Sequence, residues 1–386
     1  MDAKNTSRIR ISEVRSRRDH AQFLALPYRL YRNDPTWVPP LRLEEARRWD
    51  PDRNPSLAGR PHWRFLAWRG ESVIGRICAS LDPVFAERWR PGTGLFGFFE
   101  CENDHEAALA LLTAVEQRLS EQGAREILGP VNLTSQDEVG MLTSGYADRP
   151  RLLSPYNPPW YPSLLTTCRY MPLRRYHAYA WSPRMQPSAT MARLISDLQR
   201  RVDRSRVILR KANPDNWDSE LRRMLDLYNR AFDKVWGYTP ISWPEFRERA
   251  ERFRPFYQPD LVVFAERGEE LVGFGLALPD INILLQKMHG RLLPFGWLRM
   301  LTQRRSIRSV RYVLLAVRPD LQGSGLGLLV TAMLMERARE LGIEDAELSL
   351  VDENNAGVRR MITANGCSPV KTYTLFSKAI KAPPVD

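Results

Sequence analysis

The segment VRPDLQGSGLG, from Val317 to Gly327, constrains the fold of this chain more than any other. It stands between an apolar run, RYVLLAV, and a stretch with helical periodicity that continues through about Leu341, so it predicts a tight turn from a buried strand into a helix. Glycines at 323, 325 and 327 let the backbone turn sharply and approach a ligand closely. A simple strand-to-helix turn is the alternative, but it rarely needs three glycines in five residues.

This turn is suited to an anion. The first N–H groups of a helix lack intrahelical acceptors, and the helix dipole adds positive potential there. The segment therefore predicts a phosphate or pyrophosphate site. No Gly-Lys-Ser/Thr follows it, which excludes a Walker loop, and the Gly-x-Gly-x-Gly spacing late in the chain does not fit a Rossmann fingerprint.

Two halves of the chain show the same order of predicted elements: a hairpin, a strand, a helix and a further strand. The first half offers strands at Trp63–Arg69, Val73–Leu81, Leu95–Cys101 and Arg125–Leu128 and a helix at His105–Gln122. The second offers strands at Val207–Arg210, Leu261–Ala265, Leu271–Ala277, Arg311–Val317, Ala346–Val351 and Thr372–Ser377, and helices at Trp217–Phe232, Trp243–Phe253 and Asn355–Asn365. This order predicts a mixed α/β fold. A linker near Ser182–Ser188 divides it into domains 1–185 and 186–386.

Composition limits the possible partners. The 386 residues carry a net charge of +12, which attracts nucleic acid, acidic lipid or a phosphate-bearing cofactor. With 43% hydrophobic and 26% charged residues the chain is neither mainly disordered nor a multi-span membrane protein. Its four cysteines form no CxxC pair, so we expect neither a disulfide framework nor a metal site. The polar N-terminus has no apolar core typical of a secretory signal, and we expect a cytoplasmic protein.

The glycine-rich turn resembles that of the GNAT superfamily of acyltransferases, whose signature is Gln/Arg-x-x-Gly-x-Gly/Ala after a strand ending in Val-x-Pro. Val317, Pro319, Gln322, Gly325 and Gly327 stand in register with it. The next element also matches, because LSLVDENNAGVRRMITANGC contains a strand and then an Asn that opens a short helix ending in Gly. The resemblance covers residues from about Val207 to Lys378.

This resemblance implies two tandem GNAT-like domains, each a twisted mixed sheet flanked by helices, and an acyl-CoA cosubstrate. Pyrophosphate would lie on the backbone amides of the turn, and pantetheine between two splayed strands. The implied CoA-binding residues are Leu315, Val317, Gln322, Gly323, Ser324, Gly325, Leu326, Gly327 and Asn355. The first half has ENDHEAA after LFGFFEC and no such turn, so we expect a degenerate domain that shapes the acceptor pocket.

One position departs from the family. Many members carry a Tyr four residues before the final Gly, and it protonates the departing CoA thiolate; here the matching residue is Ile362. Thiols ionise near pH 8.5, so a thiolate can leave without full protonation. The departure weakens the assignment of mechanism more than that of fold.

An insert at residues 281–310 interleaves apolar and basic residues and contains no acid. Its apolar members are Leu284, Leu285, Leu292, Leu293, Phe295, Trp297, Leu298 and Leu301. Such a pattern is typical of a segment that lies on an anionic membrane, here the inner membrane, with cations at the headgroups. The alternative is a pair of helices that covers the domain with solvated arginines. Nucleic acid is a weaker partner, because no RNA-binding signature is present.

A second resemblance concerns the acceptor. The segments GPVNLTSQDEVGML, PDIN and GRLLPFG look like those of a tandem-GNAT bacterial group, some members of which resemble acyl-CoA-dependent ceramide synthases. This implies transfer of a long-chain acyl group to a lipid amine such as a sphingoid base. An amine must lose a proton to attack a thioester, and Asp280, Glu138 and Asp137 are the carboxylates considered for general base. A surface or capping role is the alternative for each.

We therefore expect an N-acyltransferase that uses long-chain acyl-CoA. Two alternatives remain open: acetyl transfer to a small amine or a protein, and an acyl-CoA-binding module without turnover, which the isoleucine at position 362 suggests.

Overall fold

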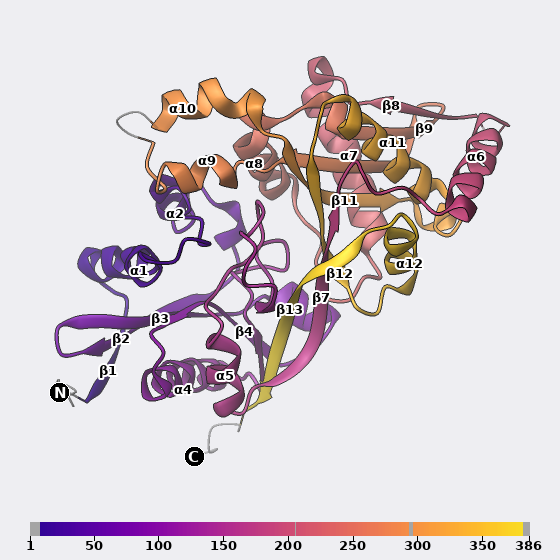
Figure 1. Cartoon of the computed structure of the whole chain (residues 1–386). Coiled ribbons are helices and arrows are strands. Elements are labelled where there is room, and N and C mark those ends of the chain that lie inside the picture. The colour runs from indigo at the N-terminus through magenta and orange to yellow at the C-terminus, as the bar shows by residue number, and fades with distance from the viewer. Residues whose placement is uncertain (1–7, 205, 293–295, 381–386) are drawn as a thin grey trace. The chain divides into compact units, whose positions relative to one another are not determined.

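The computed structural model describes residues 8–204, 206–292 and 296–380, which pack into two compact units. The first unit contains residues 1–175 and 373–386, and the second contains residues 176–372. The chain passes from the first unit to the second within strand β7 (Met171–Trp181) and returns within β13 (Ser368–Ala379) (Figure 1). The sequence analysis instead placed a single boundary at 185/186 and assigned β13 wholly to the second domain.

The first unit is a mixed sheet in the order β1-β2-β3-β4-β5-β13, with β6 beside β13. Its elements are β1 (Ile9–Glu13), α1 (Arg17–Leu30), α2 (Arg42–Arg47), β2 (His62–Arg69), β3 (Ser72–Ser80), α3 (Pro83–Arg88), β4 (Thr93–Cys101), α4 (His105–Glu121), β5 (Glu126–Gly129), β6 (Met141–Ser144) and α5 (Tyr161–Thr167). β4 and β5 run parallel, whereas the pairs β1–β2, β2–β3, β3–β4 and β5–β13 run antiparallel.

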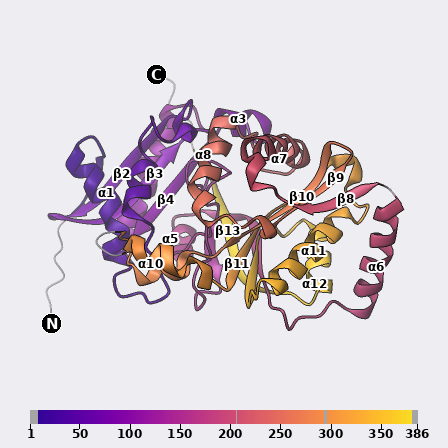
Figure 2. The same ribbon diagram turned by 90° about the horizontal axis from the view of Figure 1, so that it is seen from above.

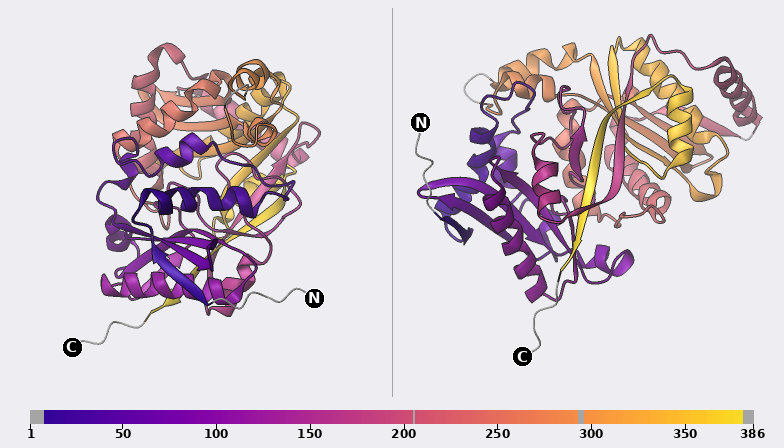
Figure 3. Two further views of the ribbon diagram at one scale, coloured as in Figure 1. Left: turned by 90° about the vertical axis from the view of Figure 1, so that its left-hand side faces the viewer. Right: turned by 60° about the horizontal axis from the view of Figure 1, so that its bottom comes forward.

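Alternating side chains give the first sheet two apolar faces. Phe65 and Ala67 of β2 belong to the core under α4 and α5, whereas Leu66 and Trp68 belong to the core under α1. This alternation follows from the two-residue period of a strand. The right-hand view of Figure 3 shows α4 in purple along one face of this sheet.

The second unit repeats this plan in the order β7-β12-β11-β10-β9-β8. Its elements are α6 (Ala189–Arg204), β8 (Val207–Lys211), α7 (Trp217–Phe232), α8 (Trp243–Phe253), β9 (Val262–Arg267), β10 (Glu270–Pro279), α9 (Asn282–Lys287), α10 (Gly296–Gln303), β11 (Ser309–Val317), α11 (Leu326–Glu340), β12 (Asp345–Asp352) and α12 (Ala356–Ala364). Figure 2 shows α7 on one side of β10, with α11 and α12 on the other. Val263 and Val272 join the core under α11 and α12, whereas Val262 and Phe274 join the core under α7 and α8.

The structure confirms the mixed α/β fold and the predicted hairpin–strand–helix–strand order of each half. One expectation was wrong: the strand at Arg311–Val317 is not buried along its length. Val313, Leu314 and Leu315 are only half-buried, because β11 leaves its neighbour β12 after Tyr312.

The sequence analysis did not predict several elements, namely β1, α1, α2, α3, β6, α5, β7 and α6. Many of them are short or mix polar residues into both faces. β7, for example, reads MPLRRYHAYAW and is largely exposed over its first residues. Periodicity is weak in these short or polar elements, and tertiary contacts decide their conformation. Helix α6 is different, because its 16 residues are clearly amphipathic and the sequence did carry a signal for it.

Helix α4 provides a matched test of the first core. Leu111 is fully buried, whereas Leu109 on the same helix is 43% exposed. Leu111→Ala should lower the free energy of unfolding by about 2–5 kcal/mol, and Leu109→Ala by less than about 0.5 kcal/mol. Chemical denaturation of the two variants measures the difference. Equal losses would show that α4 does not pack as described.

Candidate functional site

The glycine-rich turn connects the end of β11 to the start of α11. Residues Pro319–Leu321 form a 3₁₀ turn, and Gly325 is the N-cap of α11. Gly323 and Gly325 have φ angles of +80° and +92°. These values lie in the left-handed region, which costs other residues roughly 1–2 kcal/mol and glycine almost nothing. The spacing of glycines in the sequence therefore corresponds to real backbone requirements.

The glycines of the turn have different surroundings. A Cβ at Gly323 would meet no atom within 4 Å. A Cβ at Gly325 would lie 2.5 Å from Cδ1 of Leu198 on α6, and one at Gly327 would pack at 3.5 Å on Val317. The space around Gly323 is thus empty, whereas the missing side chain of Gly325 leaves room for Leu198 of α6. At Gly327 the start of α11 lies in ordinary packing distance of β11.

Backbone N–H groups of the turn are available to an anion. In the part of the chain that the structure describes, no hydrogen bond is formed by the N–H of Gly323, Gly325, Gly327 or Leu328. The N–H of Leu326 donates to Ser324 Oγ at 3.3 Å. N–H groups without acceptors at a helix N-terminus attract phosphate oxygens. This arrangement fits the predicted pyrophosphate site.

The polar side chains of the turn have structural partners. The amide of Gln322 donates to the carbonyl oxygens of Val317 and Ala231 at 3.2 and 3.3 Å, and the hydroxyl of Ser324 donates to Leu321 O at 2.6 Å. Gln322 and Ser324 therefore shape the turn through their side chains. Their backbone N–H groups are also engaged, by Pro319 O and Leu321 O, so the open donors of the turn belong to its other residues.

Asn355, the other predicted CoA-binding residue, caps α12. Its Oδ1 accepts a hydrogen bond from Val358 N at 3.1 Å, which satisfies one of the first N–H groups of that helix. The sequence prediction that an Asn opens this helix is confirmed. A role of Asn355 in binding CoA stays a prediction.

Strands β11 and β12 separate before they end. Their parallel ladder runs only from Ser309↔Asp345 to Tyr312↔Leu348. The pairing of β11 with β10 skips Val313, which marks a bulge at the same place. In the described part of the second unit, residues 314–317 pair with β10 alone, so the edge of β11 that faces β12 is open. Leu315 and Val317, both predicted to bind CoA, lie on this segment and are half-buried.

In the first unit, other residues of the chain occupy the equivalent edge, which is that of β4. β4 and β5 also separate, after Leu95↔Leu128, but Val131 N donates to Phe96 O and Asn132 Oδ1 accepts from Phe98 N at 2.7 Å. The chain following β5 thus occupies the gap beside β4.

The helix that follows β4 is also closed to an anion. Its N-cap is Asp104, whose carboxylate accepts from Ala107 N and pairs with Arg69. Burial alone would raise the pKa of Asp104, but these hydrogen bonds hold it below its ordinary value. A carboxylate thus lies where the second unit offers open N–H groups. The sequence signal was the motif DHEAA in place of a glycine-rich turn.

Asp280 is buried in the second unit. It follows β10 directly, its N–H donates to Ser309 O at 2.9 Å, and the whole residue is 0% exposed. Its Oδ1 lies 3.4 Å from the N–H of Asn282, at the start of α9. A surface role for Asp280 is therefore excluded, whereas a capping contact is present.

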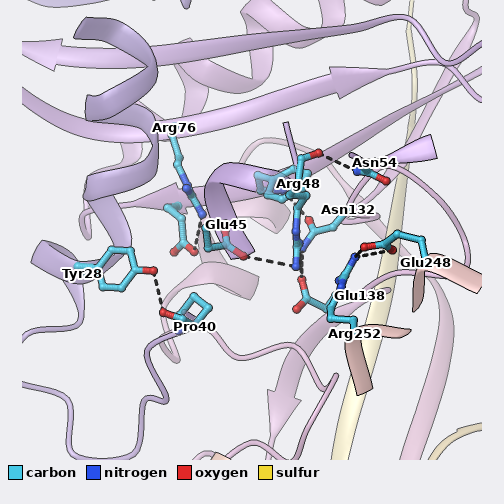
Figure 4. Close-up of polar contacts among 12 residues, drawn as sticks. Tyr28, Pro40, Glu45, Arg48, Asn54, Arg76, Asn132, Glu138, Glu248 and Arg252 are labelled. Carbon is cyan, nitrogen blue, oxygen red and sulfur yellow. Dashed lines mark hydrogen bonds and ion pairs between the residues drawn. The ribbon is translucent and has the colours of Figure 1, made fainter. Parts of the chain in front are cut away.

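Glu138 and its neighbour Asp137 belong to the first unit, and Figure 4 shows Glu138 beside Arg48. Glu138 accepts from Asn132 Nδ2 at 2.6 Å and pairs with Arg48 at 3.3 Å. Asp137 accepts from Thr134 Oγ1 at 2.8 Å. Burial opposes the charge of Arg48, but the carboxylates of Glu45 and Glu138 raise its pKa above the ordinary value. Glu138 thus belongs to a partly buried ionic cluster.

A charged cluster in the second unit was missed by the sequence analysis. Arg311 of β11, Glu347 and Ser349 of β12, and Lys371 of β13 are all buried and in contact. The only sequence signal was the polar residues at every second position of AELSLVD. Strand pairing, which the sequence does not specify, brings these residues together.

Comparison with known proteins assigns the family. The model of the acetyltransferase (GNAT) family matches residues 221–366. A protein of Caulobacter vibrioides (strain NA1000 / CB15N) named bacterial ceramide synthase is 30% identical over 369 residues, covering 93% of this chain and 94% of that protein. Protein YghO of Escherichia coli (strain K12) is 29% identical over 374 residues, covering 95% and 94%. This chain belongs to the GNAT family. It is an N-acyltransferase, of a family that uses acyl-CoA-type cosubstrates.

Solved GNAT structures share the fold. A tandem GNAT protein from the clavulanic acid biosynthesis pathway gives a TM-score of 0.56 at 13% identity and covers 98% of this chain and 100% of its own. A GCN5-related N-acetyltransferase from Sphaerobacter thermophilus gives 0.51 at 13% identity, with 98% and 97% covered. At these identities the likeness concerns the fold alone. It confirms the expected tandem GNAT architecture.

The isoleucine that replaces the usual GNAT tyrosine is part of the core. Ile362 lies on α12, is 3% exposed and belongs to the apolar cluster under α11 and α12. It has no group that could transfer a proton.

The two positive-φ glycines allow a double-mutant test of the turn. Gly323→Ala and Gly325→Ala should each cost roughly 1–2 kcal/mol of stability from backbone strain. Gly325→Ala should cost more, because its Cβ would also collide with Leu198. Leu198 is buried, so Leu198→Ala itself lowers stability. This loss should be smaller in the Gly325 variant, where the substitution also removes the collision, than in the Gly323 variant. Thermal unfolding of the five proteins checks this, and equal effects of Leu198→Ala on both backgrounds would contradict the contact.

Proposed function

We propose that this GNAT protein transfers a long-chain acyl group from acyl-CoA to a lipid amine such as a sphingoid base, which is the reaction that forms ceramide. The observation that carries the proposal is the 30% identity, over 93% of the chain, to a protein named bacterial ceramide synthase. The site geometry supports the donor half of the reaction, and the segment α9–α10 supports a lipid acceptor.

For the donor, the open N–H groups of Gly323, Gly325, Gly327 and Leu328 suit the pyrophosphate of CoA. The free edge of β11 beyond Tyr312 offers backbone groups to the amides of a pantetheine arm. Both features lie at the same end of β11, so one extended molecule can reach both. The first unit fills both positions with its own residues, and we infer one donor site in the chain.

The segment 281–310 forms two helices that expose apolar and basic side chains together. Trp297 and Leu298 of α10 are 49% and 46% exposed, beside the exposed Arg299. Figure 1 shows α9 and α10 in orange. Amphipathic rings and leucines with neighbouring cations favour the headgroup region of an anionic bilayer. We infer that α10 lies peripherally on such a surface, where both lipid substrates reside.

The other side of this segment anchors it to the second unit. Leu284 and Leu285 of α9 are buried, and Arg299 donates to Lys287 O at 3.0 Å. The segment thus also has the features of a covering helix pair, which was the alternative from the sequence. Leu293 and Phe295 lie outside the described residues, as does the side chain of Leu301. No described helix has the length and hydropathy needed to cross a membrane.

In the proposed reaction the carboxylate of Asp280 accepts a proton from the ammonium of the acceptor, and Glu138 and Asp137 are the other carboxylates considered. The neutral nitrogen attacks the thioester carbon, so a C–N bond forms and the C–S bond breaks. An N–H at the open edge of β11 donates to the carbonyl oxygen as it gains charge. As the C–S bond breaks, CoA leaves as thiolate and the nitrogen of the new amide releases its second proton to water. Water also protonates the thiolate according to its pKa near 8.5, so the reaction does not need an acid at position 362.

Release of free CoA thiol from purified protein tests the substrates. Palmitoyl-CoA with sphinganine in anionic vesicles should give sphinganine-dependent release, and acetyl-CoA should give at least tenfold less. The variant Trp297→Ser/Leu298→Ser is the control, because it should keep the turnover of detergent-dispersed substrates and lose that of vesicle-bound ones. Release from acetyl-CoA alone would instead favour a small-amine acetyltransferase, which the matched family model also allows.

Conservative amides test the carboxylates. Asp280→Asn should lower kcat at neutral pH by roughly 10²–10⁴-fold if this group accepts the proton, with little change in affinity for CoA. Glu138→Gln serves as the matched comparison, and it should lower kcat far less. The reverse ranking would assign the proton transfer to Glu138, and full activity in both variants would contradict the assignment.

A further inference from the structure

Ser349 lies where β12 leaves both of its neighbours. The ladder with β11 ends at Tyr312↔Leu348, and the ladder with β7 shifts its register between Leu348 and Val351. Ser349 is nonetheless 95% buried, at 5% relative exposure. A buried backbone carbonyl without a partner is costly, so this position needs a donor from elsewhere.

Arg311 supplies that donor. One of its terminal nitrogens donates to Ser349 O at 3.1 Å, and its Nε donates to Ser349 Oγ at 3.0 Å. The arginine stands on β11, one residue before the last paired position. Its guanidinium therefore takes the place of a ladder hydrogen bond where the two strands separate.

Glu347 and Lys371 hold this guanidinium in place. Ser349 Oγ donates to Glu347 Oε1 at 2.8 Å, and Lys371 Nζ lies 2.7 Å from Glu347 Oε2. Arg311, Glu347 and Lys371 are 5%, 2% and 2% exposed. Burial by itself would raise the pKa of Glu347, but the nearby charges of Lys371 and Arg311 keep it below the ordinary value. The carboxylate form of Glu347 is therefore favoured within this cluster.

We propose that Arg311 is a positioning residue that keeps β11 and β12 apart, so that the pantetheine arm of acyl-CoA can enter between them. This rests on the donor site of the proposed function. If Arg311 is removed, the buried carbonyl of Ser349 needs another donor. The nearest candidates are the N–H groups of β11 beyond Tyr312, because they follow the last paired position of the ladder. Extending the ladder in this way would close the gap to the substrate.

Binding of two ligands to Arg311→Met tests the proposal. CoA reaches both the turn and the gap, whereas its nucleotide half, 3′-phosphorylated ADP, reaches the turn alone. Losing a hydrogen bond from a charged group costs free energy that corresponds to roughly a tenfold change in affinity. The Kd for CoA should therefore rise about tenfold or more, whereas the Kd for the nucleotide half should rise less than about twofold. Isothermal titration calorimetry measures both constants without turnover.

Lys371→Met is the matched control. It removes one buried positive charge from the same cluster but no hydrogen bond to Ser349, so it should lower stability and leave the ratio of the two Kd values unchanged. Ser349→Ala is a milder second variant if Arg311→Met does not fold. It removes only the hydroxyl contact and should shift the same ratio in the same direction, by a smaller factor.

Each result decides the proposal. A selective loss of CoA affinity in Arg311→Met or Ser349→Ala supports it. Equal losses for both ligands, or an unchanged ratio, would leave Arg311 with a purely structural role and overturn it. If the unaltered protein binds neither ligand, the donor site itself is wrong, and this inference is overturned with it.

Discussion

The early end of the ladder between β11 and β12 is the constraint on which the second unit depends. After Tyr312↔Leu348 the two strands diverge, and β11 continues with one edge free. That edge leads directly into the glycine-rich turn, where Gly323 and Gly325 adopt left-handed conformations that direct the backbone into α11. Backbone groups that continued strand pairing would occupy remain available, so the donor binding that we propose relies on peptide N–H groups more than on side chains.

The two units show that the same topology can be opened or closed by a few residues. In the first unit the chain after β5 hydrogen-bonds to β4, and the carboxylate of Asp104 caps α4. In the second unit the corresponding strand edge and helix start have no such partners among the described residues. The difference is electrostatic as well as steric, because a carboxylate repels the phosphate that open N–H groups attract. The fold therefore does not set the function of a GNAT-like unit; its helix N-terminus and strand edge do.

The basic residues of this chain have two different roles. The surplus of +12 would suit any anion, but the buried cations of the second unit act within the structure, and Arg311 and Lys371 are held by Glu347. The exposed basic residues of α9–α10 are different, because they accompany exposed apolar side chains rather than carboxylates. This combination is the reason that we propose a lipid surface rather than a nucleic acid as the partner, since cations alone would suit either.

The sequence alone determined the mixed α/β order, the family and the turn, because these depend on local features: apolar periodicity, and glycines at 323 and 325 whose conformations other residues resist. It also located Ile362 and the change of motif in the first half. Tertiary structure decided what depends on residues distant in the chain. Leu198 against Gly325, Arg311 on Ser349 and the burial of Asp280 each arise from strand order and helix packing. Such contacts leave no periodic trace in the sequence, because each one joins a single residue to a partner that only the completed sheet brings near.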